Sequence, residues 1–356
     1  MPDDLKAVLS QVLDPLMGRA LGDLGMLTSV SEKRFGADRA VVSVPVPNYP
    51  LLDELQRRMV EAAGSDIEVE VGVMPDGARV EFMDRLKDHA GPGVGETGSR
   101  TRVVAVSSGK GGVGKSSVTT NLAVSLVRAG KSVGVIDADI WGFSIPRMLG
   151  IDYPPVVIEQ SIVPPVAHGV KAMSMDYFVA DDQAVIWRGP MLHKAIEQFL
   201  KDVWWDEPDF LLVDMPPGTG DVSISLSQFL PRAQVLLVTT PQPTAQRVAR
   251  RAALMAEKVN QEVMGVVENM SWFTGDDGVR YELFGSGGGA ALAEEVGVPL
   301  MARVPLLPEM REGADDGIPV VVAAPGSEAA IAFDELAAAV IAKKARVRTH
   351  PDLVIR

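Results

Sequence analysis

The order of apolar and polar residues changes its character near residue 100. Before that point, apolar residues recur at helical spacing between Leu5 and Leu13, and along Ile67–Val73 they alternate with glutamate or glycine. A spacing of three to four residues is typical of an amphipathic helix, and a period of two is typical of a strand with one buried face. Residues 1–86 are therefore predicted to form a small α/β domain.

A stretch without either period follows at residues 87–100. Its sequence, KDHAGPGVGETGSR, is rich in glycine and polar residues, which favour irregular backbone over helix or strand. We therefore predict a flexible linker that ends the first domain.

From residue 101 to residue 356, short apolar runs alternate with segments of helical period. The runs are continuously apolar, as expected of strands whose two faces are both covered by helices. This alternation predicts an α/β domain with a mostly parallel, doubly wound sheet, and such sheets bind ligands at the carboxyl ends of their strands. The predicted strands are 103–106, 132–137, 210–214, 235–240 and 263–269.

A glycine-rich segment, SSGKGGVGKSS at residues 107–117, links the first of these strands to a helical pattern. Its glycines leave room for backbone N–H groups to converge on phosphate oxygens, and the following helix N-terminus favours an anion. Strand, loop and helix in this order predict a Walker A phosphate-binding loop, in which Lys115 reaches the β- and γ-phosphates of ATP and Ser116 binds Mg²⁺. The predicted nucleotide-binding residues of this loop are Gly109, Lys110, Gly111, Gly112, Val113, Gly114, Lys115, Ser116 and Ser117.

Carboxylates follow two other predicted strands. Asp137 and Asp139 stand two positions apart on extended chain, so both are expected to point toward the nucleotide, unless they serve only as helix caps or turn residues. One of the pair would help to hold the water shell of Mg²⁺, and the other would orient the attacking water. Asp214 ends the strand 210–214 and precedes PPGTGD, which is typical of a Walker B carboxylate on Mg²⁺ waters.

Composition limits the classes of partner. The 356 residues carry 47 acidic and 34 basic side chains and a net charge of −13, which argues against nonspecific nucleic-acid binding and a basic membrane-binding patch. No apolar run has the length of a membrane span, and the acidic N-terminus is unlike a signal peptide, so a cytoplasmic location is expected. No cysteine occurs, which excludes disulfides and thiolate ligands from this chain.

Together these motifs resemble one family over nearly the whole chain. The blocks GKGGVGKSS, DADIWGFSIPRM, DMPPGTGD, VTTPQPTAQRVARRA, ENMSWF and FGSGGG are similar to those of Mrp-type P-loop ATPases of the MinD/Mrp class, which carry iron–sulfur clusters. Residues 1–86 resemble the small iron–sulfur assembly domain that is often fused in front of them. The resemblance implies a deviant-Walker P-loop fold, a homodimer, and apo iron–sulfur proteins or assembly factors as partners.

The resemblance also implies roles for single residues. Lys110, the second lysine of the loop, would reach the nucleotide of the partner subunit, and a solvated lysine at a loop tip is the simpler alternative. Asp139 would orient the attacking water, and Asp137 would share the Mg²⁺ shell with Asp214. Asn269 would read the adenine edge through its side-chain amide, or else serve as a turn residue at the strand end.

Two departures from the family pattern concern the cluster. In the family, a Cys-x-x-Cys motif after the ENMS block holds the cluster between two protomers, but Gly275 and Gly278 stand there in this chain. Residues 47–50, PNYP, occupy a site where relatives can carry a reactive cysteine. Asp276 and Asp277 are hard oxygen ligands, poorly suited to iron in a sulfide cluster, and are expected in a solvated turn.

These features predict slow, Mg²⁺-dependent ATP hydrolysis coupled to closure of a dimer, with Lys110, Lys115 and Asp139 as the catalytic residues. Three tasks remain open for this ATPase. The first is to carry iron–sulfur clusters to apo-proteins. The second is to act as an ATP-driven scaffold or clamp that binds no cluster. The third is to position cargo, as MinD and ParA relatives do. The third task calls for a basic amphipathic helix or a DNA-binding surface, and the basic tail at 343–348 is short.

Overall fold

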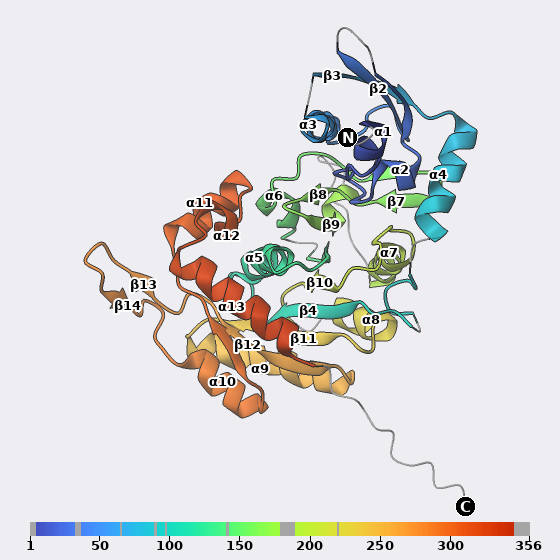
Figure 1. The fold of residues 1–356 in the computed structure, drawn as a ribbon. Helices are drawn as coiled ribbons and strands as arrows, with labels where there is room; N and C mark the ends of the chain where they lie inside the picture. Colours follow the sequence, from blue (N-terminus) through green and yellow to red (C-terminus); the bar gives the residue numbers. More distant parts are fainter. Residues whose placement is uncertain are drawn as a thin grey trace, which may run out of the picture. The chain divides into compact units, whose positions relative to one another are not determined.

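The computed structural model describes residues 5–32, 37–64, 66–88, 91–96, 98–139, 142–178, 189–218 and 221–344. The chain divides into two compact units, and most of their elements are labelled in Figure 1. Unit 1 comprises Met1–Pro92 together with Tyr153–Val166 and Asp202–Asp206. Unit 2 comprises Gly93–Asp152, Ala167–Lys201 and Glu207–Arg356.

Two short segments of unit 1 come from the region that the sequence assigns to the second domain. Ile158, Val163 and Trp204 from these segments are buried in the hydrophobic core of unit 1. Removal of these apolar side chains from water explains why both segments belong to that unit. Helix α4 (Asp76–Asp88) also includes the first two residues of the predicted linker, and residues 89, 90 and 97 of that linker lie outside the described residues.

Unit 1 is a small α/β domain built on a three-stranded sheet of order β1-β2-β3. Strands β1 and β2 pair antiparallel, whereas β2 and β3 pair parallel, and helix α3 connects the parallel pair because parallel strands need a crossover. Besides α4, the elements of this unit are α1 (Leu5–Ser10), α2 (Leu21–Leu24), β1 (Leu27–Ser31), β2 (Asp38–Val44), α3 (Leu52–Ala63), β3 (Ile67–Val73), β6 (Val156–Ile158) and β7 (Ser161–Val163).

An eight-stranded sheet of order β15-β12-β11-β4-β10-β5-β9-β8 forms the centre of unit 2. Every pairing from β15 to β9 is parallel, which confirms the predicted mostly parallel, doubly wound sheet. Its strands are β4 (Arg102–Ser108), β5 (Val133–Asp137), β8 (Val166–Ala167), β9 (Val170–Ser174), β10 (Phe210–Asp214), β11 (Gln234–Thr239), β12 (Glu262–Glu268) and β15 (Leu300–Arg303).

Helices cover both faces of this sheet. The crossover through α5 runs toward β5, whereas those through α8, α9 and α10 run toward β15, and right-handed crossovers in opposite directions place helices on opposite faces. Helix α13 packs beside α5 (Figure 1). The remaining elements are α5 (Lys115–Arg128), α6 (Ile145–Met148), a 3₁₀ turn (Met175–Phe178), α7 (Gly189–Lys201), α8 (Asp221–Phe229), α9 (Pro243–Lys258), β13 (Phe273–Thr274), β14 (Arg280–Tyr281), α10 (Gly288–Val296), α11 (Pro308–Asp316), α12 (Val320–Ala323) and α13 (Glu328–Ala342).

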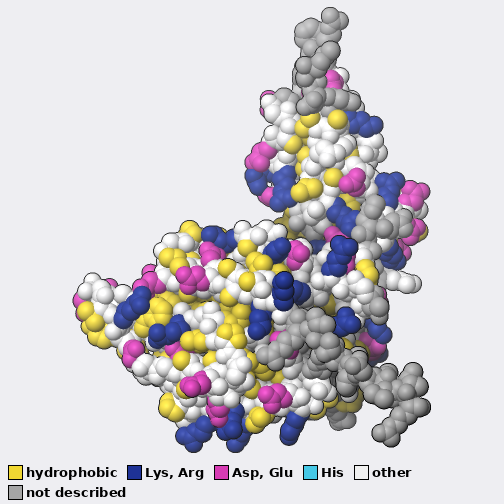
Figure 2. Space-filling view, turned by 60° about the horizontal axis from the view of Figure 1, so that its bottom comes forward, with side chains coloured by type: hydrophobic (Ala, Val, Ile, Leu, Met, Phe, Trp, Pro, Cys, Tyr) yellow, Lys and Arg dark blue, Asp and Glu magenta, His cyan; other side chains and the backbone are white. Residues whose placement is uncertain are grey.

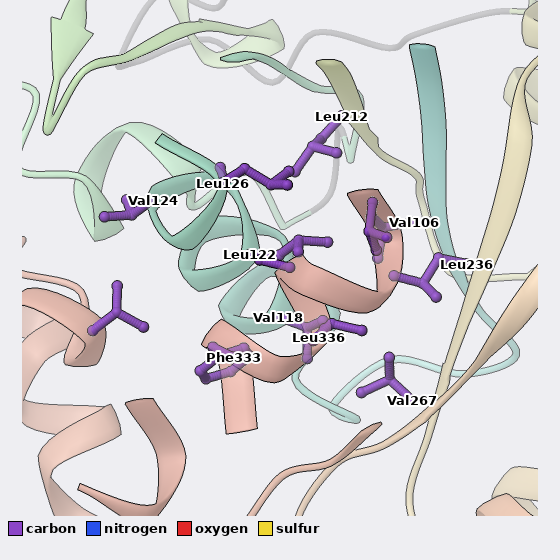
Figure 3. Close-up of a cluster of buried hydrophobic side chains, with 14 of the residues drawn as sticks. Val106, Val118, Leu122, Val124, Leu126, Leu212, Leu236, Val267, Phe333 and Leu336 are labelled. Atoms are coloured by element: carbon purple, nitrogen blue, oxygen red, sulfur yellow. The ribbon is translucent and has the colours of Figure 1, made fainter. Parts of the chain in front are cut away.

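The core of unit 2 lies between the sheet and the α5–α13 layer. Figure 3 shows Val118, Leu122 and Leu126 of α5 lying close to sheet residues and to Phe333 and Leu336 of α13. This burial fixes α5 against the sheet, and it therefore fixes the position of the loop that joins the carboxyl end of β4 to α5. Among the described helices, none is long and apolar enough to cross a membrane.

The strand order also creates a topological switch point. Strand β4 sends its crossover toward β5, whereas the neighbouring β10 sends its crossover toward β11. The connections therefore diverge above the carboxyl ends of these two strands, which is where open α/β sheets bind ligands.

Candidate nucleotide site

The predicted phosphate-binding loop connects β4 to α5 at this switch point. Gly112 and Gly114 adopt left-handed backbone conformations, with φ of 79° and 80°, which side chains rarely allow. Gly109 meets a second constraint, since a Cβ there would lie 2.2 Å from the backbone nitrogen of Ala249 in α9. The glycines therefore permit both the curvature of the loop and its close approach to α9.

A cavity of about 370 Å³ opens beside this loop. Its lining includes the loop from Lys110 to Ser117, Asp139, and Met148 and Pro217 on other segments. The predicted loop residues are thus brought together around one cavity, with Gly109 just outside its lining. Residues 219 and 220 of the PPGTGD segment lie outside the described residues.

Lys115 and Asp214 form an ion pair at the base of the cavity. Lys115 Nζ lies 2.6 Å from Asp214 Oδ2, and both side chains are almost fully buried. The same carboxylate accepts hydrogen bonds from Ser116 Oγ at 2.6 Å and from Thr119 Oγ1 at 2.7 Å. The structure thus joins the predicted Walker A and Walker B residues directly. Thr119, one helical turn after Lys115, is an additional residue that the sequence analysis did not single out.

Asp139 lies on the cavity side of the same cluster. Its Oδ2 is 3.5 Å from Lys115 Nζ, and its Oδ1 is buried without a hydrogen-bond partner. A buried carboxylate oxygen that retains unused acceptor capacity is suited to binding a water or another donor. Asp139 thus has an unused acceptor beside the cavity, and its water-orienting role stays a prediction.

Asp137 differs in its surroundings from Asp139. Its fully buried carboxylate accepts hydrogen bonds from the backbone N–H groups of Asp139, Ser144 and Ile145 and from Ser174 Oγ, and the described cavity lining does not include it. Burial, and then the nearby Asp214 charge, raise the pKa of Asp137 to about 7. These bonds tie Asp139, Ser144 and Ile145 to the end of β5, and the Mg²⁺-shell role of Asp137 stays a prediction.

The side chains of Lys110 and Asn269 each donate a hydrogen bond to another residue of the same chain. Lys110 Nζ donates to Gln242 Oε1 at 3.0 Å, at the N-terminus of α9. Asn269 Nδ2 donates to the backbone carbonyl of Val113 at 2.9 Å, inside the phosphate-binding loop. Both residues therefore lie at the site, and their predicted contacts with a partner's nucleotide and with adenine stay predictions.

A buried carboxylate network beside the site was not predicted. Glu268, the last residue of β12, accepts hydrogen bonds from Ser271 Oγ at 2.9 Å, from the Gly289 N–H at 2.5 Å and from Arg303 Nε at 3.1 Å. It thereby joins the ENMSWF block, the FGSGGG block and β15. The available sequence signal was a glutamate that directly precedes Asn269 at the end of an apolar strand.

The hairpin β13–β14 carries Gly275 and Gly278 in its turn. Gly278 has a φ of 74°, and a Cβ at Gly275 would lie 2.8 Å from Asp277 Oδ1. Asp277 in turn accepts hydrogen bonds from the Tyr281 hydroxyl at 2.6 Å and from the Val279 N–H at 2.9 Å. The two positions at which the resemblance implies cysteines are therefore part of a closed turn.

The base of this hairpin is held by Glu328 of α13. Glu328 accepts hydrogen bonds from Trp272 Nε1, Thr274 Oγ1 and Arg280 Nη2 at 2.8–3.0 Å, and these bonds lower its pKa to about 2. Arg280 also stacks over the Trp272 ring, with its Cζ 4.5 Å from the ring centre. Within the described part of the chain, no group of three His, Cys, Asp or Glu residues could hold a metal ion.

Comparisons with known proteins support a nucleotide site. A family model described as ParA, NUBPL iron-transfer P-loop NTPase, matches residues 99–341, well over half of the chain. The chain belongs to this family. Nucleotide binding and hydrolysis are therefore the general activity of its P-loop unit.

Relatives of this NTPase cover almost its whole length. A Mycobacterium tuberculosis protein named iron-sulfur cluster carrier protein is 42% identical over 337 residues, which cover 91% of this chain and 88% of that protein. Among solved structures, an Archaeoglobus fulgidus nucleotide-binding protein in complex with ADP is 35% identical, with a TM-score of 0.54, covering 61% of this chain and 86% of that one. MinD of Pyrococcus horikoshii, complexed with Mg-ADP, is 26% identical, with a TM-score of 0.53, covering 67% of this chain and 96% of that one.

Proposed function

We propose that unit 2 binds ATP with Mg²⁺ in the cavity beside the phosphate-binding loop and hydrolyses it slowly. The convergence of Lys115, Ser116, Asp139 and Asp214 beside one cavity of about 370 Å³ is the observation that carries this proposal. The volume falls within the range of ordinary small-molecule sites. The Mg-ADP complex of the MinD relative supports the same choice of ligand.

The residues at the site fit a magnesium ion. Ser116 Oγ and Asp214 Oδ2 lie 2.6 Å apart, and hydroxyl and carboxylate oxygens are the hard donors that Mg²⁺ prefers. Ser116 and Asp214 would hold the ion, with Asp137 as an outer candidate, and the ion would neutralise charge on the phosphate oxygens.

The chemistry of this chain's residues follows from their placement. Nucleotide binding requires Lys115 to exchange its contact with Asp214 for the phosphate tail, where its ammonium stabilises charge on the transferring group. The free Oδ1 of Asp139 accepts a hydrogen bond from the attacking water and aims it at the γ-phosphorus. The proposed reaction is in-line hydrolysis of ATP to ADP and phosphate.

The proposal includes a homodimer in which Lys110 acts on the partner's nucleotide. Lys110 lines the cavity, and its ammonium donates one hydrogen bond to the neutral side chain of Gln242, so it can be released at low cost. Lys110→Ala should therefore slow hydrolysis without weakening ATP binding to the separate subunit. Phosphate release that is unchanged in this variant, measured across a range of protein concentrations, would contradict the role in trans.

We further propose that the ATPase serves iron–sulfur cluster carriage or assembly for apo-proteins. Support comes from the M. tuberculosis relative, which is named for that task and aligns with 91% of this chain. This chain has no cysteine, and Gly275 and Gly278 form a closed turn, so its own residues do not fit a thiolate-held cluster. If a cluster is bound, its thiolate ligands must therefore come from a partner protein. The alternative, a scaffold that binds no cluster, remains open.

Anaerobic reconstitution with iron and sulfide tests whether this chain binds an iron–sulfur cluster by itself or only together with a partner protein. We expect the isolated protein to acquire no sulfide-to-iron charge-transfer absorbance while its ATPase activity stays intact. The absorbance should appear when a cysteine-containing apo-protein is added, and ATP should change the rate of its appearance. A stable cluster on the isolated chain would contradict the partner-thiolate proposal.

Positioning of cargo has less support than cluster assembly. On the face shown in Figure 2, Lys and Arg side chains are scattered among acidic and apolar ones instead of forming a continuous basic area. The basic tail at 343–348 lies outside the described residues from 345 onward. Sedimentation with anionic vesicles or with DNA in the presence of ATP would restore this candidate if the protein bound either one.

A further inference from the structure

Asn269 is placed to act on the phosphate-binding loop. It follows β12, where its backbone N–H donates to the Thr239 carbonyl at 2.8 Å. Its side chain is buried, Nδ2 donates to the Val113 carbonyl at 2.9 Å, and Oδ1 is buried without a partner. One N–H of the amide is therefore engaged by the backbone of a loop 156 residues earlier in the chain.

This hydrogen bond orients one peptide group of the loop. Because a peptide is planar and trans, the carbonyl of Val113 and the N–H of Gly114 point in opposite directions. Asn269 holds the carbonyl toward the end of β12, and Gly114 lines the cavity. The bond thus keeps the Gly114 N–H turned away from β12 and available to a phosphate oxygen.

Packing around Gly114 supports the same conclusion. A Cβ at this position would lie 2.2 Å from Asn269 Nδ2, and Gly114 has a φ of 80°. The amide therefore fills the space beside the glycine, so the peptide has little room to rotate. Gly114 is also the N-cap of α5, directly before Lys115, so its orientation also affects where the Lys115 side chain begins.

We propose that Asn269 is a positioning residue, which fixes the Val113–Gly114 peptide for phosphate binding. This inference rests on the proposed function, because it concerns the same ATP site. It differs from the adenine contact that the family resemblance implies, since it predicts an effect on ligands that have no base.

The experiment compares Asn269→Ala with the unmodified protein in calorimetric titrations. The ligands are ATP, GTP and inorganic tripolyphosphate, each with Mg²⁺. Loss of one hydrogen bond at the loop should weaken all three by a similar factor, roughly three- to tenfold, and leave the ratio of ATP to GTP affinities unchanged. Asn260→Asp, in the exposed turn after α9 and outside the cavity lining, serves as a control that should bind all three normally.

Two outcomes would overturn the inference. A base reader would weaken ATP, leave tripolyphosphate unchanged and shift the ATP-to-GTP ratio, and a residue without a role at the site would change nothing. Thermal unfolding without ligand checks that Asn269→Ala is folded, and Asn269→Leu, which nearly keeps the shape of the side chain and adds no charge, replaces it otherwise. If the unmodified protein bound no ATP at all, the proposed function would fail, which is a different result from either of these.

Discussion

Replacement of Asp139 by asparagine should slow ATP hydrolysis without weakening the binding of Mg-ATP. The substitution keeps the shape of the side chain and removes its charge, so it weakens the acceptor that we assign to the attacking water. In the structure, Oδ1 has no hydrogen-bond partner and Oδ2 lies 3.5 Å from Lys115 Nζ, whereas Asp214 approaches the same ammonium to 2.6 Å. Asp139 is thus the weaker partner of Lys115, and its charge repels an incoming phosphate.

The magnitude follows from these contacts. Positioned acid–base groups contribute roughly 10²- to 10⁴-fold to rate, which is about 3–5 kcal/mol of barrier, so kcat of Asp139→Asn should fall within that range. The Kd for Mg-ATP should stay within about fivefold or tighten, because Lys115 keeps its shorter contact with Asp214 and a charge that repels the phosphate is removed.

Phosphate release at saturating Mg-ATP measures the first quantity, and calorimetry measures the second. Asp152→Asn, an exposed aspartate outside the cavity lining, is the matched control and should leave both quantities unchanged. A kcat within twofold of the unmodified protein would refute the water-orienting role of Asp139. A large loss of affinity with little change in kcat would show instead that Asp139 serves binding.

Three further predictions concern charge at and beyond the site. Burial raises the pKa of Asp137 to about 7 from an ordinary 3.8, so the folded protein holds the carboxyl proton more tightly than the unfolded chain does. The free energy of unfolding should therefore fall by about 4 kcal/mol as the pH rises from roughly 4 to 7. Denaturant titrations of Asp137→Asn should lack this decline, and an equal decline would contradict the argument. Asp214→Asn should retain ATP binding in EDTA, since Lys115 loses its competing partner, yet calorimetry should show no gain on adding Mg²⁺. The pKa of Glu328 is lowered to about 2, so its stabilisation is present above roughly pH 4.5 and lost as pH falls through about 2. At neutral pH, Glu328→Gln should cost about 1 kcal/mol and speed hydrogen exchange at 273–281, and unchanged exchange there would remove its anchoring role.

The central sheet was predictable because its signals are local. Strands β4, β5, β10, β11 and β12 are continuous apolar runs, and their predicted boundaries agree with the structure to within two residues. The phosphate-binding loop was equally local, because its glycines and flanking elements lie within one short segment. The proximity of this loop to Asp214 followed from the rule that parallel strands have their carboxyl ends at the same edge of the sheet.

Contacts between distant segments were not predictable in the same way. The bonds that surround Asp137 depend on how the chain folds back at Ser144 and Ile145, and the Glu268 network joins three blocks that the sequence keeps apart. The segments 153–166 and 202–206 carry apolar side chains, but periodicity does not say which core will bury them. A resemblance predicted that Asn269 belongs to the site, and only the structure showed its bond to Val113.

Calorimetric titration of the nucleotide-free protein with Mg-ATP tests the central claim most directly, with Lys115→Ala as the comparison. If the loop grips a triphosphate as we propose, the unmodified protein should release or absorb heat with a saturable curve, and the folded Lys115→Ala variant should give none. Absence of heat from the unmodified protein, or equal binding by the folded variant, would contradict the account.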